Sequence, residues 1–315
     1  MQLPRIPYLT TTYRIARDRG PRAAAATITD FLREETTRGI HAVSSPVGPG
    51  QPIFEREWDV LVICDAARVD LTREVAPEYD YISNVDTHVS TASYSKGWMD
   101  SNFTDEYADE MARTIHVTAN PFSDTLDEEQ WAVLDEVWRH NWDEDNGTTL
   151  PEPLVDRGIH YWRQREELGA DRMIIHLMQP HLPFIGTDWM RGQRLEDWGH
   201  ANTEKTVWEK VRDGEIPFEE MWDAYAENLR IAFDEIDRLL RNMDAEKVAI
   251  TADHGNLVGE HGLWGHPPGV KYPDLRIVPW IETSGIDEGA SVPTIGDETE
   301  SATDVEDRLS SLGYL

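Results

Sequence analysis

Short runs of apolar, β-branched residues recur along the chain, and each is too short to be a complete helix. The runs lie at 59–65, 115–119, 172–178, 247–252 and 276–281. Runs of this length and composition are typical of strands buried in a parallel sheet. We therefore expect these segments to form the centre of the fold.

Helical periodicity fills much of the chain between these runs. Apolar residues recur at three- and four-residue spacing in 218–242, the clearest case. Further helices are expected at 95–113, 127–142 and 154–168. Strands that alternate with helices predict an α/β fold with a mainly parallel central sheet flanked by helices.

The two ends of the chain differ from its middle. Residues 1–50 carry an excess of Arg in their first thirty positions and an amphipathic pattern after Ala23, and are expected to form a helical arm. Residues 51–315 are expected to form one domain, closed by a helix and a docking segment at 304–315. Packing of the arm on the acidic body is favoured over a role as a membrane or partner anchor.

The charge is strongly unbalanced, and this limits the classes of partner. The chain of 315 residues has 29 Lys and Arg against 60 Asp and Glu, a formal net charge of −31. Such a surface repels nucleic-acid phosphates and anionic membranes. Because 39% of the residues are hydrophobic, the chain has enough apolar side chains for a core and is not expected to be disordered. Only five of the basic residues are Lys, and this composition is typical of proteins that work in high salt.

Cysteine content and hydropathy bear on the compartment. The single cysteine, Cys64, excludes a disulfide within the chain and indicates a reducing environment. No apolar run reaches the roughly 18 residues of a membrane span, and the N-terminus lacks the apolar core of a signal peptide. We expect a cytoplasmic protein in a high-salt environment, of undetermined oligomeric state.

Two acids stand where predicted strands end. Asp65 ends the first run, and Asp253 follows the fourth with His254 and Gly255 directly after it. Reactive groups of parallel sheets gather at the carboxyl ends of the strands. Two carboxylates and an imidazole are a donor set for one divalent cation, of which Mn, Ca, Mg and Zn are all candidates, and the missing side chain of Gly255 would leave room for it. A single terminal Asp is more often a helix cap; the pair with the adjoining His favours metal.

Histidines are concentrated near the same strand ends. His261 and His266 follow His254 in the glycine-rich segment TADHGNLVGEHGLWGH, and His181 lies in the proline-containing loop QPHLPF. A cluster of this density in one loop is not a core pattern.

These motifs, in this order, resemble the alkaline phosphatase superfamily, and within it the sulfatase-like branch. The resemblance rests on Asp65 after the first strand, QPHLPF, the helix with Tyr225 and AFDEIDRLL, TADHGNLVGEHGLWGH and the closing LGYL, from about residue 57 to 315. It implies an alkaline-phosphatase-like fold. It also implies a metal-dependent hydrolase or transferase of phosphate or sulfate esters that forms a covalent intermediate on a side chain.

The resemblance assigns roles to individual residues. Asp65, Asp253 and His254 match metal ligands, and His181 matches a histidine that contacts the substrate anion. His266 stands where relatives place a Lys or His near the ester oxygens, and His261 is a further candidate for substrate contact. Arg68, three residues after Asp65, either reaches the anion or forms an ordinary ion pair.

The nucleophile is expected among the hydroxyls of 87–103. Ser95 is the natural cap of a predicted helix, where the helix dipole and a metal favour an alkoxide, and is the first choice. Ser93 is second and Thr91 third, with Ser90 a further possibility. Ser and Thr are also ordinary helix caps, so the position alone does not distinguish the two roles.

The same segment departs from the sulfatase pattern. No candidate hydroxyl is followed by the Pro or Ala and the Arg of the element C/S-x-P/A-x-R, and Ala66 replaces a second acid after Asp65. We therefore expect a hydrolase of phosphate mono- or diesters that acts through Ser or Thr on a small anionic or glycan-linked ester. The alternatives are a sulfatase with an unmodified Ser, a transferase of a phospho-alcohol group to a glycan, and a non-catalytic member that binds a metal or a glycan.

Overall fold

The computed structural model describes residues 13, 15–187, 189, 205–295, 305, 308, 309 and 312. Most of the closing helix expected at 304–315 lies outside these residues. None of the helices within the described ranges has the length and apolar character needed to cross a membrane.

The described helices are α2 (Pro21–Val43), α3 (Val69–Val75), α4 (Ser95–Asn102), α5 (Ala108–Met111), α6 (Pro151–Arg163), α7 (Val207–Arg212), α8 (Phe218–Leu240) and α9 (Pro273–Arg276). The described strands are β1 (Val60–Cys64), β2 (Asp86–Val89), β3 (Thr114–Thr118), β4 (Val133–Glu136), β5 (Trp142–Asp143), β6 (Thr148–Thr149), β7 (Arg172–Leu177), β8 (Ala245–Thr251), β9 (Leu257–Val258), β10 (Trp264–Gly265) and β11 (Ile277–Gly285).

Within the described residues, the central sheet has seven strands in the order β2-β11-β8-β1-β7-β3-β4. Strands β8, β1, β7, β3 and β4 pair in parallel, whereas β11 is antiparallel to both of its neighbours, β8 and β2. Helices flank the sheet, so the predicted α/β class is confirmed. The predicted strands are present as β1, β3, β7, β8 and β11.

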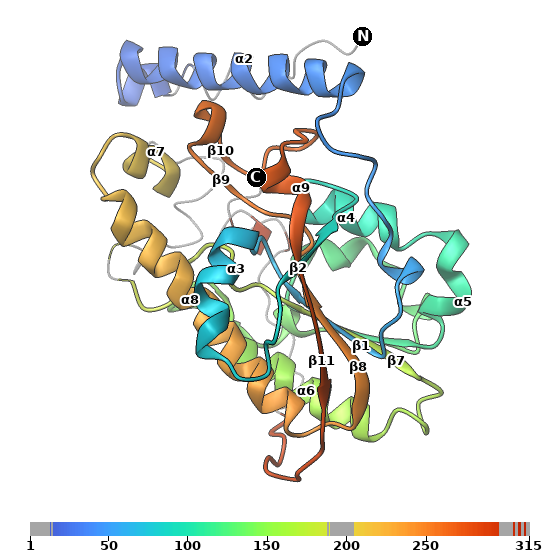
Figure 1. The fold of residues 1–315 in the computed structure, drawn as a ribbon. Helices are drawn as coiled ribbons and strands as arrows, with labels where there is room; N and C mark the ends of the chain where they lie inside the picture. The colour runs from blue at the N-terminus through green and yellow to red at the C-terminus, as the bar shows by residue number, and fades with distance from the viewer. Residues whose placement is uncertain are drawn as a thin grey trace.

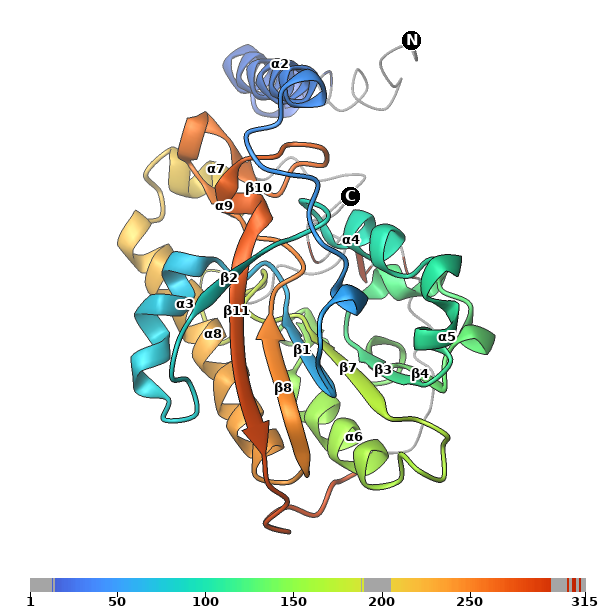
Figure 2. The same cartoon turned by 45° about the vertical axis from the view of Figure 1, so that its right-hand side comes forward.

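Helices cover both faces of this sheet (Figure 1). On one face, α3, α6 and α8 bury the larger apolar cluster, whose strand residues include Val60, Val62 and Ile175. On the other face, α4 and α5 pack over Leu61, Ile63 and other residues of the second cluster. Every residue of β1 is buried, because both faces of this central strand are covered. Figure 2 shows the same three layers from the side.

The helix predicted at 127–142 is wrong. This segment contains β4, which pairs in parallel with β3 through registers such as Ile115↔Val133, and short 3₁₀ turns on either side. Its apolar residues fit helical spacing as well as they fit a short edge strand, so pairing with β3 decides the conformation. The helix predicted at 95–113 is present only as two shorter helices, α4 and α5, and β2 was not foreseen.

The first long helix, α2, lies across the end of the molecule that carries β9, β10 and α9 (Figures 1 and 2). Arg33 Nη1 donates to the Gly262 carbonyl at 2.8 Å, and Arg38 Nε donates to the Pro268 carbonyl at 2.8 Å. The helix is therefore fastened to the segment that carries His261 and His266.

Candidate active site

The site is built at the carboxyl ends of adjacent parallel strands. Asp65 directly follows β1, and Asp253 and His254 follow its neighbour β8. One ligand atom from each of these residues lies within 4.8 Å of the other two, and all three residues are buried. The structure therefore brings together the three predicted metal ligands.

The ring orientation of His254 suits a metal ligand. Its Nδ1 lies 2.7 Å from the carbonyl oxygen of Gly255, which can only accept a hydrogen bond, so Nδ1 carries the proton. In the neutral ring, Nε2 then has a free lone pair. Nε2 is 3.4 Å from Asp253 Oδ2 and 3.6 Å from Asp65 Oδ1, and it points into the cluster.

Asp253 supplies the second indication that a cation belongs here. Its Oδ1 accepts hydrogen bonds from the backbone N–H of Ala66 at 3.1 Å and of His254 at 2.9 Å. Its Oδ2 is buried and has no hydrogen-bond partner among the described residues. An unpaired buried carboxylate oxygen is costly, and a cation would compensate it. Two carboxylates, one of them with this unpaired oxygen, and an imidazole lone pair fit a divalent cation.

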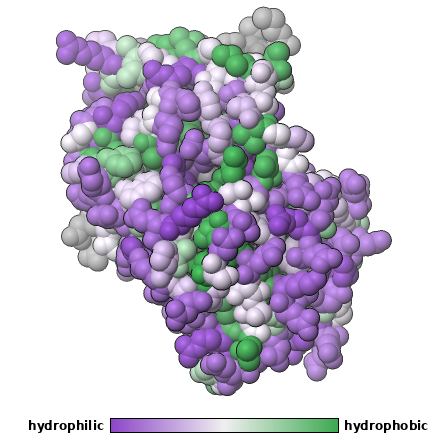
Figure 3. Space-filling view, viewed as in Figure 1, coloured by the Kyte–Doolittle hydropathy of each residue, from purple (hydrophilic) through white to green (hydrophobic). Residues whose placement is uncertain are grey.

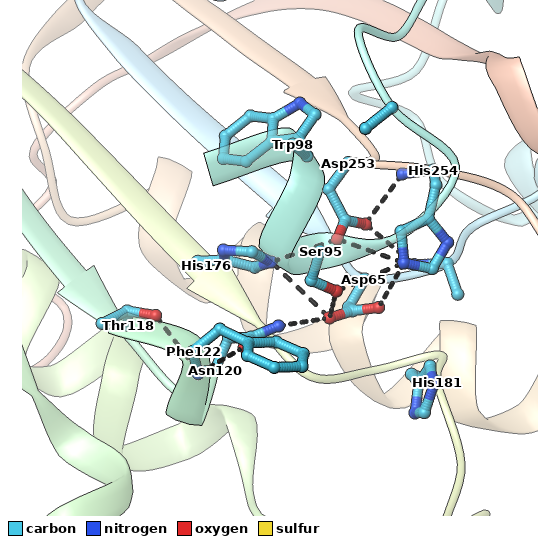
Figure 4. A network of polar contacts seen from close by, with 12 residues as sticks. Asp65, Ser95, Trp98, Thr118, Asn120, Phe122, His176, His181, Asp253 and His254 are labelled. Carbon is cyan, nitrogen blue, oxygen red and sulfur yellow. Dashed lines mark hydrogen bonds and ion pairs between the residues drawn. The ribbon is translucent and has the colours of Figure 1, made fainter. Parts of the chain in front are cut away.

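Ser95 lies beside the three ligands (Figure 4). Its hydroxyl Oγ is 3.2 Å from Asp65 Oδ2 and 3.2 Å from His254 Nε2. Ser95 is the first residue of α4; the cap position belongs to Tyr94, and no side chain makes a cap hydrogen bond there. The ordinary explanation of this serine, as a helix cap, therefore does not apply.

The other candidate hydroxyls make different bonds. Ser93 Oγ donates to the Pro267 carbonyl at 3.1 Å, and Ser90 Oγ donates to the backbone carbonyl of Asp253. Thr91 Oγ1 accepts from the Asn102 side chain at 3.0 Å. Each of these bonds joins the segment to a neighbouring loop or helix. Of the four hydroxyls, Ser95 is the one whose described partners are side-chain atoms of predicted metal ligands.

Two residues of the cluster were missed by the sequence analysis. Asn120, which follows β3, donates its Nδ2 to Asp65 Oδ2 at 2.8 Å (Figure 4). His176, inside β7, has its Nε2 3.7 Å from Asp65 Oδ2 and 3.9 Å from Asp253 Oδ2, and is fully buried. The position of Asn120 just after a predicted strand was an available signal, whereas His176 within an apolar run was not.

The surroundings of Asp65 keep it ionised. Burial alone would raise the pKa of its carboxyl group, but the nearby His176, His181 and His254 outweigh burial and hold the pKa below its ordinary value. Asp65 is therefore an anion in the pH range where proteins work. A carboxylate must be ionised to bind a cation.

His181 and His266 form a pair next to the ligands. Their Nε2 atoms are 2.9 Å apart, and the rings of His254 and His266 have centroids 4.6 Å apart. His181 Nδ1 lies 2.7 Å from the Leu182 carbonyl and so carries its proton, which leaves Nε2 to accept from His266. Burial lowers the pKa of both rings, so the pair is neutral.

Arg68 is held by carboxylates. Its guanidinium contacts Asp70 at 2.7 Å and Glu260 at 2.9 Å, with Asp274 at 3.8 Å, and Nη1 donates to the Asn256 carbonyl at 2.5 Å. These are the bonds of the ion-pair alternative, and they tie the turn after β1 to the 256–260 segment and α9. Contact of Arg68 with substrate stays a prediction.

His261 is separated from the other histidines in its contacts. It is exposed and stacks on Tyr272, with ring centroids 3.7 Å apart. The structure therefore groups His254, His266 and His181, but gives His261 no described contact with them.

The missing side chain of Gly255 does not leave space for an ion. A Cβ atom at this position would lie 2.0 Å from the backbone oxygen of Asp274. Gly255 N–H also donates to the Leu275 carbonyl at 2.9 Å. The glycine is needed because the backbone of α9 approaches it, and the expectation from the sequence is corrected on this point.

No family model matches the chain, and no curated protein matches it in sequence. Several solved structures resemble it. The soluble domain of lipooligosaccharide phosphoethanolamine transferase A from Neisseria meningitidis is 14% identical, with a TM-score of 0.47 over 77% of this chain and 79% of that one. The chain spans 59% of the full integral membrane transferase from the same organism.

Two further structures show the range of these similarities. The C-terminal periplasmic domain of EcEptC from Escherichia coli, in complex with Zn, is 14% identical, with a TM-score of 0.45 over 78% of each chain. A putative sulfatase from Bacteroides thetaiotaomicron is 12% identical, with a TM-score of 0.37 over 71% of this chain and 64% of that one.

Proposed function

We propose that the chain is a metal-dependent hydrolase of phosphate mono- or diesters that acts through a covalent intermediate on Ser95. The observation that carries the proposal is the position of the Ser95 hydroxyl, 3.2 Å from both Asp65 Oδ2 and His254 Nε2. A nucleophile next to a group of metal ligands is the arrangement that covalent ester transfer requires.

Asp65, Asp253 and His254 would hold one divalent cation, whose identity stays open among Mn, Ca, Mg and Zn. When bound, such a cation supplies Lewis-acid stabilisation of an alkoxide and of a phosphoryl oxygen. Asn120 holds the Asp65 carboxylate by a hydrogen bond to Oδ2, His176 Nε2 lies 3.7 Å from the same oxygen, and Oδ1 faces His254. This arrangement fixes the ligand before a cation arrives.

The chain's own groups account for the reaction in two steps. Ser95 Oγ bonds to phosphorus as the bond between phosphorus and the leaving alcohol breaks, and the serine proton leaves along the hydrogen bond to Asp65 Oδ2. From the protonated pair, His266 Nε2–H, which donates to His181 in the resting site, gives its proton to the departing oxygen and becomes neutral. Water or an acceptor alcohol then attacks phosphorus and gives its proton to the neutral pair. The bond between phosphorus and Ser95 Oγ breaks, and Asp65 Oδ2 returns the serine proton to Ser95.

An anionic substrate would also change the two histidines. Burial keeps the His181–His266 pair neutral, and a phosphoryl anion next to it would favour the protonated form. Binding of the substrate would then protonate the histidine pair, which is the proton donor for the leaving group. This supports a substrate that is itself an anion, although the net charge of the chain is −31.

A serine replacement tests the proposal. We expect Ser95→Ala to lower turnover of an aryl phosphate ester by at least about a thousandfold, since it removes the nucleophile, while the bound metal content measured by elemental analysis is retained. Ser93→Ala is the matched control because its hydroxyl bonds to the Pro267 carbonyl, and it should keep most of the activity.

Intact-mass measurement distinguishes the remaining alternatives. A phosphoryl adduct on the unmodified chain that is absent from Ser95→Ala supports the proposal, and release of the adduct to an added alcohol faster than to water would indicate a transferase. Turnover of aryl sulfate in preference to aryl phosphate would indicate the sulfatase alternative. Absence of both adduct and turnover in metal-loaded protein would leave the non-catalytic alternative.

A further inference from the structure

The outward face of α2 is apolar and exposed. Ile28 is 44% exposed, Leu32 57%, Ile40 58% and Val43 91%. The other exposed large hydrophobic residues of the described chain are Tyr13, Phe218, Ile286, Val292 and Ile295. In the space-filling view, hydrophobic side chains appear along the top of the molecule, where α2 lies (Figure 3).

These side chains share one side of the helix. At about 100° per residue they project within an arc of about 120°. The other positions in this arc are Pro21, Arg22, Ala25, Thr29, Thr36 and Gly39, all exposed. The arc contains no carboxylate in a chain with 60 Asp and Glu. An acidic surface that keeps a protein soluble is therefore missing on this side.

The opposite side of α2 is already used. Ala24, Thr37 and His41 are buried, and the N–H of Lys271 donates to His41 Nδ1 at 2.9 Å. With the arginine bonds to the Gly262 and Pro268 carbonyls, these contacts hold the helix in one orientation on the body. Rotation that would bury the apolar arc against the body would break all of them.

The charge of the residues that precede α2 favours an anionic lipid surface as the partner. Residues 1–22 contain Arg5, Arg14, Arg17, Arg19 and Arg22 against one acid, Asp18, which pairs with Arg17, and Arg22 at the start of α2 is exposed. Cationic charge beside an exposed apolar helix face complements an anionic lipid surface. A second copy of the chain would instead bring like-charged N-terminal segments and two strongly acidic bodies together.

We propose that α2 lies in the interface of an anionic lipid bilayer, with its apolar arc towards the acyl chains and the acidic body turned away. The net charge of −31 would oppose binding to an anionic membrane only if the charge were spread evenly over the surface. Charges beyond about 10 Å are largely screened at 0.1 M salt, so the local composition of α2 and 1–22 decides. The inference does not rest on the proposed ester chemistry.

Vesicle flotation of the full chain tests this docking. We expect binding to vesicles of equal parts phosphatidylglycerol and phosphatidylcholine, and weaker binding to phosphatidylcholine alone. The double variant Leu32→Asp/Ile40→Asp should partition at least about tenfold more weakly, because two apolar side chains leave the interface. The matched control is Ile286→Asp/Val292→Asp, which changes two exposed apolar residues away from α2 and should bind as the unmodified chain does.

Other outcomes would overturn the inference. Failure of the unmodified chain to bind anionic vesicles would do so, as would equal binding by the two double variants or equal binding to both lipid compositions. Light scattering in the absence of vesicles gives a further check, since a dimer that Leu32→Asp/Ile40→Asp dissociates would assign the face to self-association. Circular dichroism and thermal unfolding verify that both variants are folded.

Discussion

At the scale of single residues, Asn120 offers a test of how Asp65 is held. Its Nδ2 donates to Asp65 Oδ2 at 2.8 Å, and its Oδ1 accepts from the Phe122 N–H at 3.0 Å. We expect Asn120→Ala to weaken metal affinity about 10- to 100-fold, the usual effect of removing such a supporting partner. Titration calorimetry with the metal alone measures this, and unchanged affinity would show that Asp65 needs no support from Asn120.

Gly255 gives a second prediction, for stability. Because a Cβ would lie 2.0 Å from the Asp274 oxygen, Gly255→Ala must displace backbone and should lower the free energy of unfolding by about 2 kcal/mol or more. Gly39→Ala, on the exposed face of α2 with nothing within 4 Å, should instead be neutral or stabilise the protein by up to about 1 kcal/mol. Urea denaturation compares the two, and equal effects would contradict the crowding argument.

The residues of the site were predictable to different degrees. Asp65, Asp253 and His254 stand at strand ends, where chemistry gathers in parallel sheets, so position and residue type were enough to select them. His176 was not predictable, because a histidine inside an apolar run gives no sign of which strand will lie beside it. Ser95 was chosen as a helix cap; the structure gives the cap to Tyr94, so the choice rested partly on the wrong reason.

At the scale of elements, Arg68 joins the turn after β1 to the 256–260 segment and α9. We expect Arg68→Met to lower the free energy of unfolding by about 2 kcal/mol, as for loss of hydrogen bonds to a charged group, and to change KM for substrate less than about twofold. Thermal unfolding measures the change in stability, and steady-state kinetics measure the change in KM. A large rise in KM with unchanged stability would restore the role in substrate binding.

The elements also show where sequence patterns stop being decisive. The runs that became β1 and β7 are buried throughout, and β8 is buried from Val248 to Thr251, so their apolar composition specified them. The segment of β4 carries Asp135 among its apolar residues, and that carboxylate is paired with Arg157 of α6 at 2.7 Å. Such a long-range partner has no local signal, and for this reason a helix was predicted there instead.

At the scale of the whole molecule, the charge of −31 predicts a dependence on salt. Mutual repulsion among carboxylates opposes the compact state, and added salt screens it. We expect the free energy of unfolding to rise as KCl is added from low concentration, and turnover of an anionic ester to rise over the same range. Stability that falls steadily with salt would contradict this.

Cys64 provides a probe for that measurement. Burial raises the pKa of its thiol, with the Asp253 and Asp65 charges adding to the effect, and the residue is 1% exposed in the central strand. It should therefore react with a thiol reagent only when the molecule unfolds globally. The labelling rate should fall with added KCl, whereas fast labelling in every condition would show that β1 opens locally.

The position of β1 has a consequence for how the chain folds. Its two neighbours in the sheet, β7 and β8, are made more than a hundred residues later, as pairs such as Leu61↔Ile174 and Leu61↔Ala249 show. During synthesis, both edges of β1 therefore remain unpaired until most of the chain has left the ribosome. Contacts of such high sequence separation fold slowly and expose strand edges to aggregation. Every chain ended before β8 lacks the partner of β1, so neither its sheet nor its site is completed.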